Sequence, residues 1–183
     1  MIITALLFLV LSIPVIVISL RTLTSINSHG FYRFFSWEFI IFLFAVNYKY
    51  WFSRPFSINQ IVSWIFLMIS LYLVIAGIMQ MKKAGKAAGR RQDRELYNFE
   101  KTDKLVTSGI FKYIRHPLYS SLLFLTWGIF LKNPLCLLLI PAALSTAFLI
   151  LTALADEKEC KEYFGLDYGN YMKNTTRFIP YLF

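Results

Sequence analysis

Two short polar blocks in this chain carry side chains that can bind ions and move protons. Arg115 and His116 stand directly before Pro117, where a strongly apolar run begins, and Asp156 and Glu157 follow another apolar run. A cation, an imidazole and two carboxylates could together bind a zwitterionic ligand and take a proton from a reacting group. Either block alone would carry little information, because ionisable residues at the ends of membrane helices commonly act as interfacial anchors.

The two blocks occur together with specific flanking residues. Residues 104–119 read K-L-V-T-S-G-I-F-K-Y-I-R-H-P-L-Y, and residues 156–171 follow the pattern D-E-x-x-C-x-x-x-F-G-x-x-Y-x-x-Y. The pair resembles the isoprenylcysteine carboxyl methyltransferase and phospholipid methyltransferase family, whose members are integral membrane enzymes that use S-adenosylmethionine. The resemblance covers roughly the C-terminal half of the chain and implies a methyltransferase with this cofactor.

The resemblance also implies a set of cofactor-binding residues. They lie before and within L-V-T, around H-P-x-Y, and at the first acid of the second block, and they correspond here to Asp103, Lys104, Leu105, Val106, His116, Pro117, Leu118, Tyr119 and Asp156. Phe111 is a further candidate, because either Ile110 or Phe111 could flank the adenine ring. S-adenosylmethionine has a zwitterionic end, a sulfonium and a flat base, so it requires anion-binding donors, a carboxylate and apolar walls, and all of these are present.

Methyl transfer requires a nucleophile held in line and, for an amine or thiol acceptor, a group that takes its proton. Either Glu157 or His116 is predicted to take that proton, and Arg115 is a further catalytic candidate. Thr152, one helical turn before Asp156, is predicted to lie beside the acceptor. Isoprenylcysteine enzymes have an arginine at this position, associated with the substrate carboxylate.

An unpaired buried carboxylate is costly, so the uncharged Thr152 favours an acceptor with a neutral or cationic reacting group, such as a lipid amine or a small thiol. The alternative is a true isoprenylcysteine carboxyl methyltransferase, whose acceptor is the carboxylate of a prenylated cysteine. A sterol-reductase-like protein, or a non-catalytic membrane protein on the same scaffold, remains an alternative of a different kind.

Composition predicts an all-α, polytopic membrane protein, because 57% of the 183 residues are hydrophobic. Five apolar runs are predicted to span the bilayer, at residues 2–20, 37–52, 58–81, 118–131 and 135–155. A cleaved signal peptide competes for the first run, but that run lacks a basic leading region. The last two runs form a helical hairpin, whose neighbouring ends should bring both polar blocks into one pocket, and a cytosolic amphipathic helix follows. We expect one domain over residues 1–183, with three N-terminal spans in 1–81 and the cofactor-binding part in 82–183.

The distribution of lysine and arginine predicts the orientation of these spans. Ten lysine and arginine residues lie in residues 82–115, and four follow residue 156. The loop at residues 49–54 carries two such residues, and the loop at residue 132 carries one. The positive-inside rule therefore puts the C-terminus and the predicted active site in the cytosol, and the N-terminus outside. Membrane topology also explains the net charge of +9 without a nucleic-acid partner.

Other polar residues carry no predicted function. Cys136 and Cys160 have no metal-binding or disulfide spacing, so we predict free thiols and no metal. His29 is predicted to lie in a loop and to take no part in binding. The bilayer and a lipid or small-molecule methyl acceptor are the expected partners, and the sequence does not indicate an oligomeric state.

Overall fold

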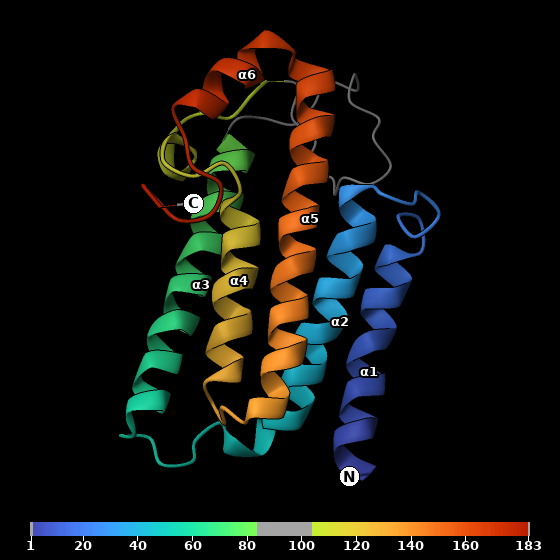
Figure 1. Ribbon diagram of the computed structural model, residues 1–183, viewed down its shortest axis with the longest axis vertical. Coiled ribbons are helices and arrows are strands. Elements are labelled where there is room, and N and C mark those ends of the chain that lie inside the picture. The colour runs from blue at the N-terminus through green and yellow to red at the C-terminus, as the bar shows by residue number, and fades with distance from the viewer. Residues whose placement is uncertain (1, 84–103, 183) are drawn as a thin grey trace.

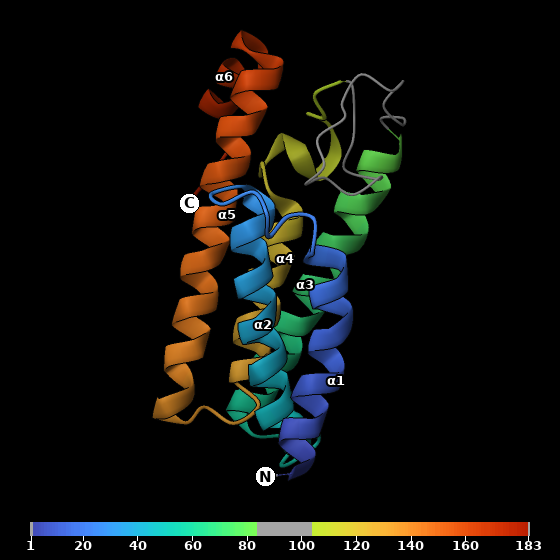
Figure 2. The same ribbon diagram turned by 90° about the vertical axis from the view of Figure 1, so that its right-hand side faces the viewer.

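A computed structural model describes residues 2–83 and 104–182, which form a bundle of long helices (Figure 1). The long helices are α1 (Ile2–Ser19), α2 (His29–Asn47), α3 (Ile58–Lys83), α4 (Pro117–Phe130) and α5 (Leu139–Phe164). The short elements are α6 (Leu166–Lys173) and the 3₁₀ turns η1 (Tyr48–Tyr50), η2 (Gly109–Lys112) and η3 (Cys136–Leu138). In the bundle, α3 packs against α4, α2 packs against α5, and α1 contacts α2 (Figure 2).

The helices have the length and composition of membrane spans. Among the described residues, three segments are long and apolar enough to cross a bilayer, namely α1, α3 and residues 136–164, and α4 is a shorter apolar helix. Large apolar side chains project outward, such as Ile3 at 66% exposure and Met68 at 61%, as expected where lipid surrounds a bundle. The prediction of an all-α, polytopic membrane protein is confirmed.

Helix α2 begins at His29, well before the predicted start near residue 37. Ser28 caps it, because the Ser28 side chain accepts a hydrogen bond from the Phe31 N–H at 3.2 Å. The acidic Glu38 does not interrupt the helix, since Ser12 on α1 donates to its carboxylate at 2.7 Å. Much of the predicted polar loop is therefore helical, and the prediction that His29 lies in a loop is wrong.

Helix α5 continues well beyond the apolar residues that were predicted to end it at Ala155. No glycine or proline stands between Ala155 and Gly165, so the α-helix extends through the whole acidic block to Phe164. Gly165 then adopts a φ of 59°, which turns the chain into α6. The change in hydropathy at residue 155 therefore marks the end of the apolar surface and not the end of the helix.

Buried hydroxyl groups connect three helices in the bundle interior. The Ser145 Oγ on α5 lies 3.0 Å from the Ser36 Oγ on α2 and 3.1 Å from the Thr126 Oγ1 on α4. All three side chains are fully buried. Because hydrogen bonds between membrane helices stabilise their packing, these contacts fix α5 against α4. The end of α5 that carries the acidic block thus stays beside the start of α4.

Candidate functional site

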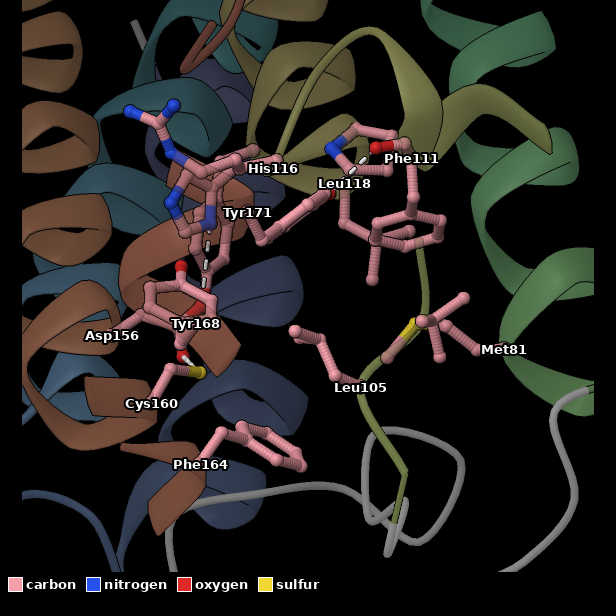
Figure 3. Close-up of a pocket in the computed structure, with 14 residues that line it drawn as sticks. Met81, Leu105, Phe111, His116, Leu118, Asp156, Cys160, Phe164, Tyr168 and Tyr171 are labelled. Carbon is pink, nitrogen blue, oxygen red and sulfur yellow. Dashed lines mark hydrogen bonds and ion pairs between the residues drawn. The ribbon is translucent and has the colours of Figure 1, made fainter. Parts of the chain in front are cut away.

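A pocket enclosing about 680 Å³, part of it open to solvent, lies at the end of the bundle that carries α6 (Figure 3). It is lined by Met81, Leu105, Val106, Phe111, Arg115, His116, Pro117, Leu118, Tyr119, Asp156, Cys160, Phe164, Tyr168 and Tyr171. These residues come from the end of α3, the segment before α4, the start of α4, the end of α5, and α6. Both polar blocks of the sequence therefore meet at one pocket.

The pocket has two different walls (Figure 3). One wall is apolar and is formed by Met81, Leu105, Phe111 and Leu118. The facing wall carries polar groups from His116, Asp156, Cys160 and Tyr168. A ligand with one charged end and one apolar or aromatic part matches this division.

Most of the predicted cofactor-binding residues line this pocket, namely Leu105, Val106, Phe111, His116, Pro117, Leu118, Tyr119 and Asp156. Lys104 instead borders an adjoining hollow, which shares Leu105, Phe164 and Tyr171 with the pocket. Asp103 lies outside the described residues. The structure thus brings the set together, and its binding of a cofactor stays a prediction.

His116 stands at the centre of the polar wall, just before α4. Its Nδ1 lies 3.4 Å from the Asp156 Oδ2, its Nε2 lies 3.3 Å from the Glu157 Oε1, and its ring stacks on Tyr119. Burial disfavours the charged imidazole, but hydrogen bonds to the two carboxylates and their negative charges outweigh burial and raise the pKa of His116 above 6.5. The two carboxylates thus stabilise the imidazolium form of His116.

Glu157 points away from the pocket into a cluster of cations. Its carboxylate accepts from the Arg177 Nε at 2.9 Å and Nη2 at 3.0 Å, and from the Arg115 Nε at 3.1 Å. The side chain is buried and does not line the pocket. A carboxylate whose oxygens already accept from two guanidinium groups is poorly placed to take a proton from an acceptor. The arrangement therefore argues against the predicted role of Glu157 as a base and favours a positioning role.

Arg115 is held in the same cluster. Besides Glu157, its guanidinium donates to the backbone carbonyl of Met172 at 3.2 Å and to that of Thr175. Its donors thus bind the acidic block and the end of α6, although part of the side chain borders the pocket. This geometry favours an anchoring role for Arg115 over the predicted catalytic one.

The C-terminal segment supports the pocket from behind. The Arg115 N–H donates to the Thr176 carbonyl at 2.9 Å, and the His116 N–H donates to the Arg177 carbonyl at 3.2 Å. A parallel bridge pairs Ile114 with Thr176. Backbone hydrogen bonds thus fix the strand-like segment before α4, and with it the position of His116.

Thr152 does not reach the pocket. It is fully buried in the bundle, and its hydroxyl donates to the Phe148 carbonyl one turn earlier in α5, at 2.7 Å. The predicted contact between Thr152 and the acceptor is therefore not supported by the position of the side chain. The side chain one helical turn before Asp156 thus points into the bundle interior, and the residue spacing alone did not indicate this direction.

Several lining residues were not among the predicted site residues. Cys160 and Phe164 follow Asp156 on α5 at intervals of four, and Tyr168 and Tyr171 come from α6. The helical spacing of these residues was visible in the sequence. Which way their side chains face could not be predicted without knowing that α5 continues unbroken to Phe164. The Tyr171 hydroxyl donates to the Phe111 carbonyl at 2.6 Å, which ties α6 to η2.

Both cysteines are free thiols, as predicted. Cys160 lies on the polar wall, where its Sγ is 3.6 Å from the Asp156 Oδ1. Cys136 is exposed in η3, at the opposite end of the bundle from α6 (Figure 1).

His29 contacts the acidic block from outside the pocket. Its Nδ1 lies 2.6 Å from the Glu159 Oε2, and the potential ligand atoms of His29, Asp156 and Glu159 all lie within 4.8 Å of one another. Burial opposes protonation, but the bond to Glu159 and the charge of Asp156 raise the pKa of His29 above 6.5. Such side chains can also hold a metal ion. That the protein binds no metal stays a prediction.

The chain is similar to proteins that are named as methyltransferases. Two rice proteins, from Oryza sativa subsp. indica and subsp. japonica, are each named probable protein-S-isoprenylcysteine O-methyltransferase. Each is 28% identical to this chain over 123 residues, which cover 65% of this chain and 63% of the relative. The protein-S-isoprenylcysteine O-methyltransferase of Xenopus laevis is 31% identical over 125 residues, covering 66% of this chain and 42% of that protein.

The matched part of this chain thus spans less than two thirds of each of these relatives. No solved structure matches the chain. The model of the phospholipid methyltransferase family matches residues 58–166, which include α3, the segment before α4, and the acidic block of α5. Because this match covers more than half of the chain, the protein belongs to the phospholipid methyltransferase family.

Proposed function

We propose that the protein is a methyltransferase that uses S-adenosylmethionine and methylates a lipophilic or small acceptor at the cytosolic face of a membrane. The observation that carries this proposal is the pocket in which both sequence blocks meet, with a polar wall opposite an apolar wall. Residues 1–183 would act as one domain, in which the first three helices support the cofactor-binding part.

The side chains at the pocket fit the cofactor chemically. A ring N–H of His116 can donate to the carboxylate of the amino-acid end, and Asp156 can accept from its ammonium or from the ribose. Apolar and aromatic walls at Leu105, Val106 and Phe111 suit the adenine ring. When bound, the cofactor supplies an electrophilic methyl group on a sulfonium.

The protein's own contribution is to hold the reactants in position and to exclude water. Methyl transfer is an in-line displacement, so a close and aligned approach of the nucleophile supplies most of the rate enhancement. Arg115, Glu157 and Arg177 hold the segment that carries His116. Of the two predicted bases, His116 lines the pocket and Glu157 does not. An imidazole can take a proton only in its neutral form, so neutral His116 is the proposed base for an amine or thiol acceptor.

An acceptor with a neutral or cationic reacting group suits the electrostatics of the pocket best. The cationic side chains among the described lining residues are Arg115 and His116, and both contact Glu157. A carboxylate acceptor would have to compete with Glu157 for these charges, whereas an amine or thiol would not. We therefore propose a lipid amine or a small thiol.

Carboxyl methylation is the second candidate, because the relatives are named isoprenylcysteine O-methyltransferases. The two candidates differ in the acceptor that is methylated. The test is the initial rate with methyl-labelled S-adenosylmethionine on a farnesylcysteine analogue, an aminophospholipid and a small thiol. We expect transfer to the amine or thiol. Efficient transfer to the farnesylcysteine carboxylate would instead establish the second candidate.

A reductase-like or non-catalytic protein on this scaffold would transfer no methyl group to any acceptor. Wild-type protein that binds a different nucleotide and shows no affinity for S-adenosylmethionine would contradict the proposed function. Asp156→Asn is the matched inactive control for the transfer assay, since it keeps the size of the side chain and removes its charge.

A further inference from the structure

His29 connects the start of α2 to the acidic block of α5 through two contacts with one side chain. Its Nδ1 lies 2.6 Å from the Glu159 Oε2, and its backbone N–H donates to the Glu159 Oε1 at 3.2 Å. The imidazole has no exposure to solvent. A two-point contact of this kind fixes both the distance and the orientation of the elements that it joins.

The two hydrogen bonds between His29 and Glu159 form a clamp, which holds the part of α5 that projects past the start of α2 (Figure 2). The projecting part carries Asp156 and Glu159, three residues apart and therefore on neighbouring positions of one helix face. A contact that holds Glu159 in place also fixes the rotation of α5 about its own axis, and with it the direction of the Asp156 side chain. The orientation of the pocket carboxylate thus depends on the contact that His29 makes.

The start of α2 is itself held firmly. A side chain added at Gly30 would bring its Cβ to 2.7 Å from the Thr22 Cβ. The connection between α1 and α2 therefore packs closely over the residue next to His29. His29 is a fixed point against which α5 can be positioned, and not the end of a mobile loop.

Asp156 consequently has a histidine within reach from two separate elements. His116 approaches it from the pocket, with 3.4 Å between the Nδ1 and the Asp156 Oδ2. His29 approaches from α2, within the 4.8 Å group that also includes Glu159. His29 does not line the pocket, so any influence of His29 on a ligand there must pass through the acidic block.

We propose that His29 is a positioning residue for the pocket, which holds Asp156 in its binding orientation by clamping Glu159. The proposal rests on the proposed function, because it assumes that Asp156 binds the cofactor. It gives α2, which lies outside the region that matches the family, an indirect part in cofactor affinity, through the acidic block.

The test is a double-mutant cycle on the full chain in detergent, with the dissociation constant of S-adenosylmethionine measured by calorimetry. We expect His29→Ala to weaken binding by about tenfold. The same substitution in an Asp156→Asn background should weaken binding by less than about twofold, since His29 acts through the Asp156 carboxylate. His29→Asn, whose amide can replace the Nδ1 donor, should recover part of the lost affinity.

Tyr32→Phe is the matched control, because it removes an exposed hydrogen bond to Asn27 from the same helix. Glu159→Gln provides a second way to weaken the clamp if His29→Ala does not fold. Wild-type affinity in His29→Ala, or in Glu159→Gln where the alanine variant cannot be purified, would overturn the inference, as would equal losses in both backgrounds. A wild-type protein that does not bind S-adenosylmethionine at all would instead overturn the proposed function.

Discussion

Arg177 and Glu157 form a two-point ion pair that joins the C-terminal segment to α5. The Nε to Oε1 distance is 2.9 Å, and the Nη2 to Oε2 distance is 3.0 Å. Glu157 is buried, so protein groups and not water must balance its charge. The segment after α6 is therefore an integral part of the structure that supports the pocket.

Arg177→Ala should destabilise the folded protein. Arg177 is one of three cationic side chains that face the buried Glu157 carboxylate, together with Arg115 and His116. Its removal takes away two charge-assisted hydrogen bonds, and we expect a loss of about 1.5–3 kcal/mol in the free energy of unfolding. Denaturant unfolding in detergent measures this loss. Lys173→Ala is the control, because Lys173 is an exposed cation near the same end of the chain. Equal stability of the two variants would show that the pair contributes little.

Glu157→Gln distinguishes a positioning role from a proton-accepting role. If Glu157 anchors the guanidinium groups, the variant should have a lower thermal midpoint and weaker cofactor binding, because Arg115 and Arg177 lose their shared anion. Thermal unfolding and calorimetry measure these two properties. A variant with wild-type stability and affinity but without methyl transfer would restore Glu157 as the base.

The stability of the protein should depend on pH through His116. The pKa of His116 is raised above 6.5 in the folded state. Its stabilising contribution is therefore fully present below that unfolded-state value and is lost as the pH rises through the folded pKa. The thermal midpoint should fall over this range, and His116→Gln should remove part of the fall. The pKa of His29 is also raised in the folded state, so His29 contributes with the same sign, and the slope should decrease further in the double variant with His29→Asn.

An unchanged slope in His116→Gln would assign the pH dependence to other groups. Thermal scans in detergent from about pH 5.5 to about pH 9 cover the range in which an imidazole titrates.

The sequence predicted the meeting of the two blocks correctly because that prediction rests on chain connectivity. The turn after residue 131 forces α4 and α5 to run antiparallel, so Pro117 and Asp156 must lie at the same end of the bundle. Predictions that depended on side-chain direction were weaker. Thr152 faces the bundle interior, and Glu157 faces Arg177, because the neighbouring helices and the C-terminal segment determine which face of α5 is covered.

Helix boundaries were also predicted less well where the first or last turns of a helix consist of polar residues. The early turns of α2 contain Arg33, and the last turns of α5 contain the acidic block, so hydropathy placed both ends too far inside the apolar runs. Buried contacts explain why these polar turns remain helical: Arg33 lies over the Trp37 ring, and Glu159 contacts His29. Hydropathy cannot reveal such pairs, because it scores each residue alone and not the neighbour that the side chain contacts.

Reporter fusions test the proposed orientation in the membrane. Helix α6, which lines part of the pocket, lies at the opposite end of the bundle from the start of α1 (Figure 1), and the positive-inside rule puts the α6 end in the cytosol. A C-terminal fusion should therefore report the cytosol. A reporter inserted at Phe56, which is 90% exposed in the connection between α2 and α3, should report the opposite side. A C-terminal reporter outside the cytosol, with the Phe56 reporter in the cytosol, would contradict the proposed cytosolic location of the site.

The most direct test of the account is a calorimetric titration of the detergent-solubilised protein with S-adenosylmethionine, for the wild type, His116→Ala and Asp156→Ala. Loss of a charge-assisted hydrogen bond typically costs about 1.5–3 kcal/mol, so each variant should bind more than about tenfold more weakly. Tyr32→Phe, and not His29→Ala, is the control, because the structure connects His29 to the acidic block. Saturable wild-type binding that both pocket variants weaken is the predicted result. No wild-type binding, or equal dissociation constants in folded wild-type and variant proteins, would contradict the account.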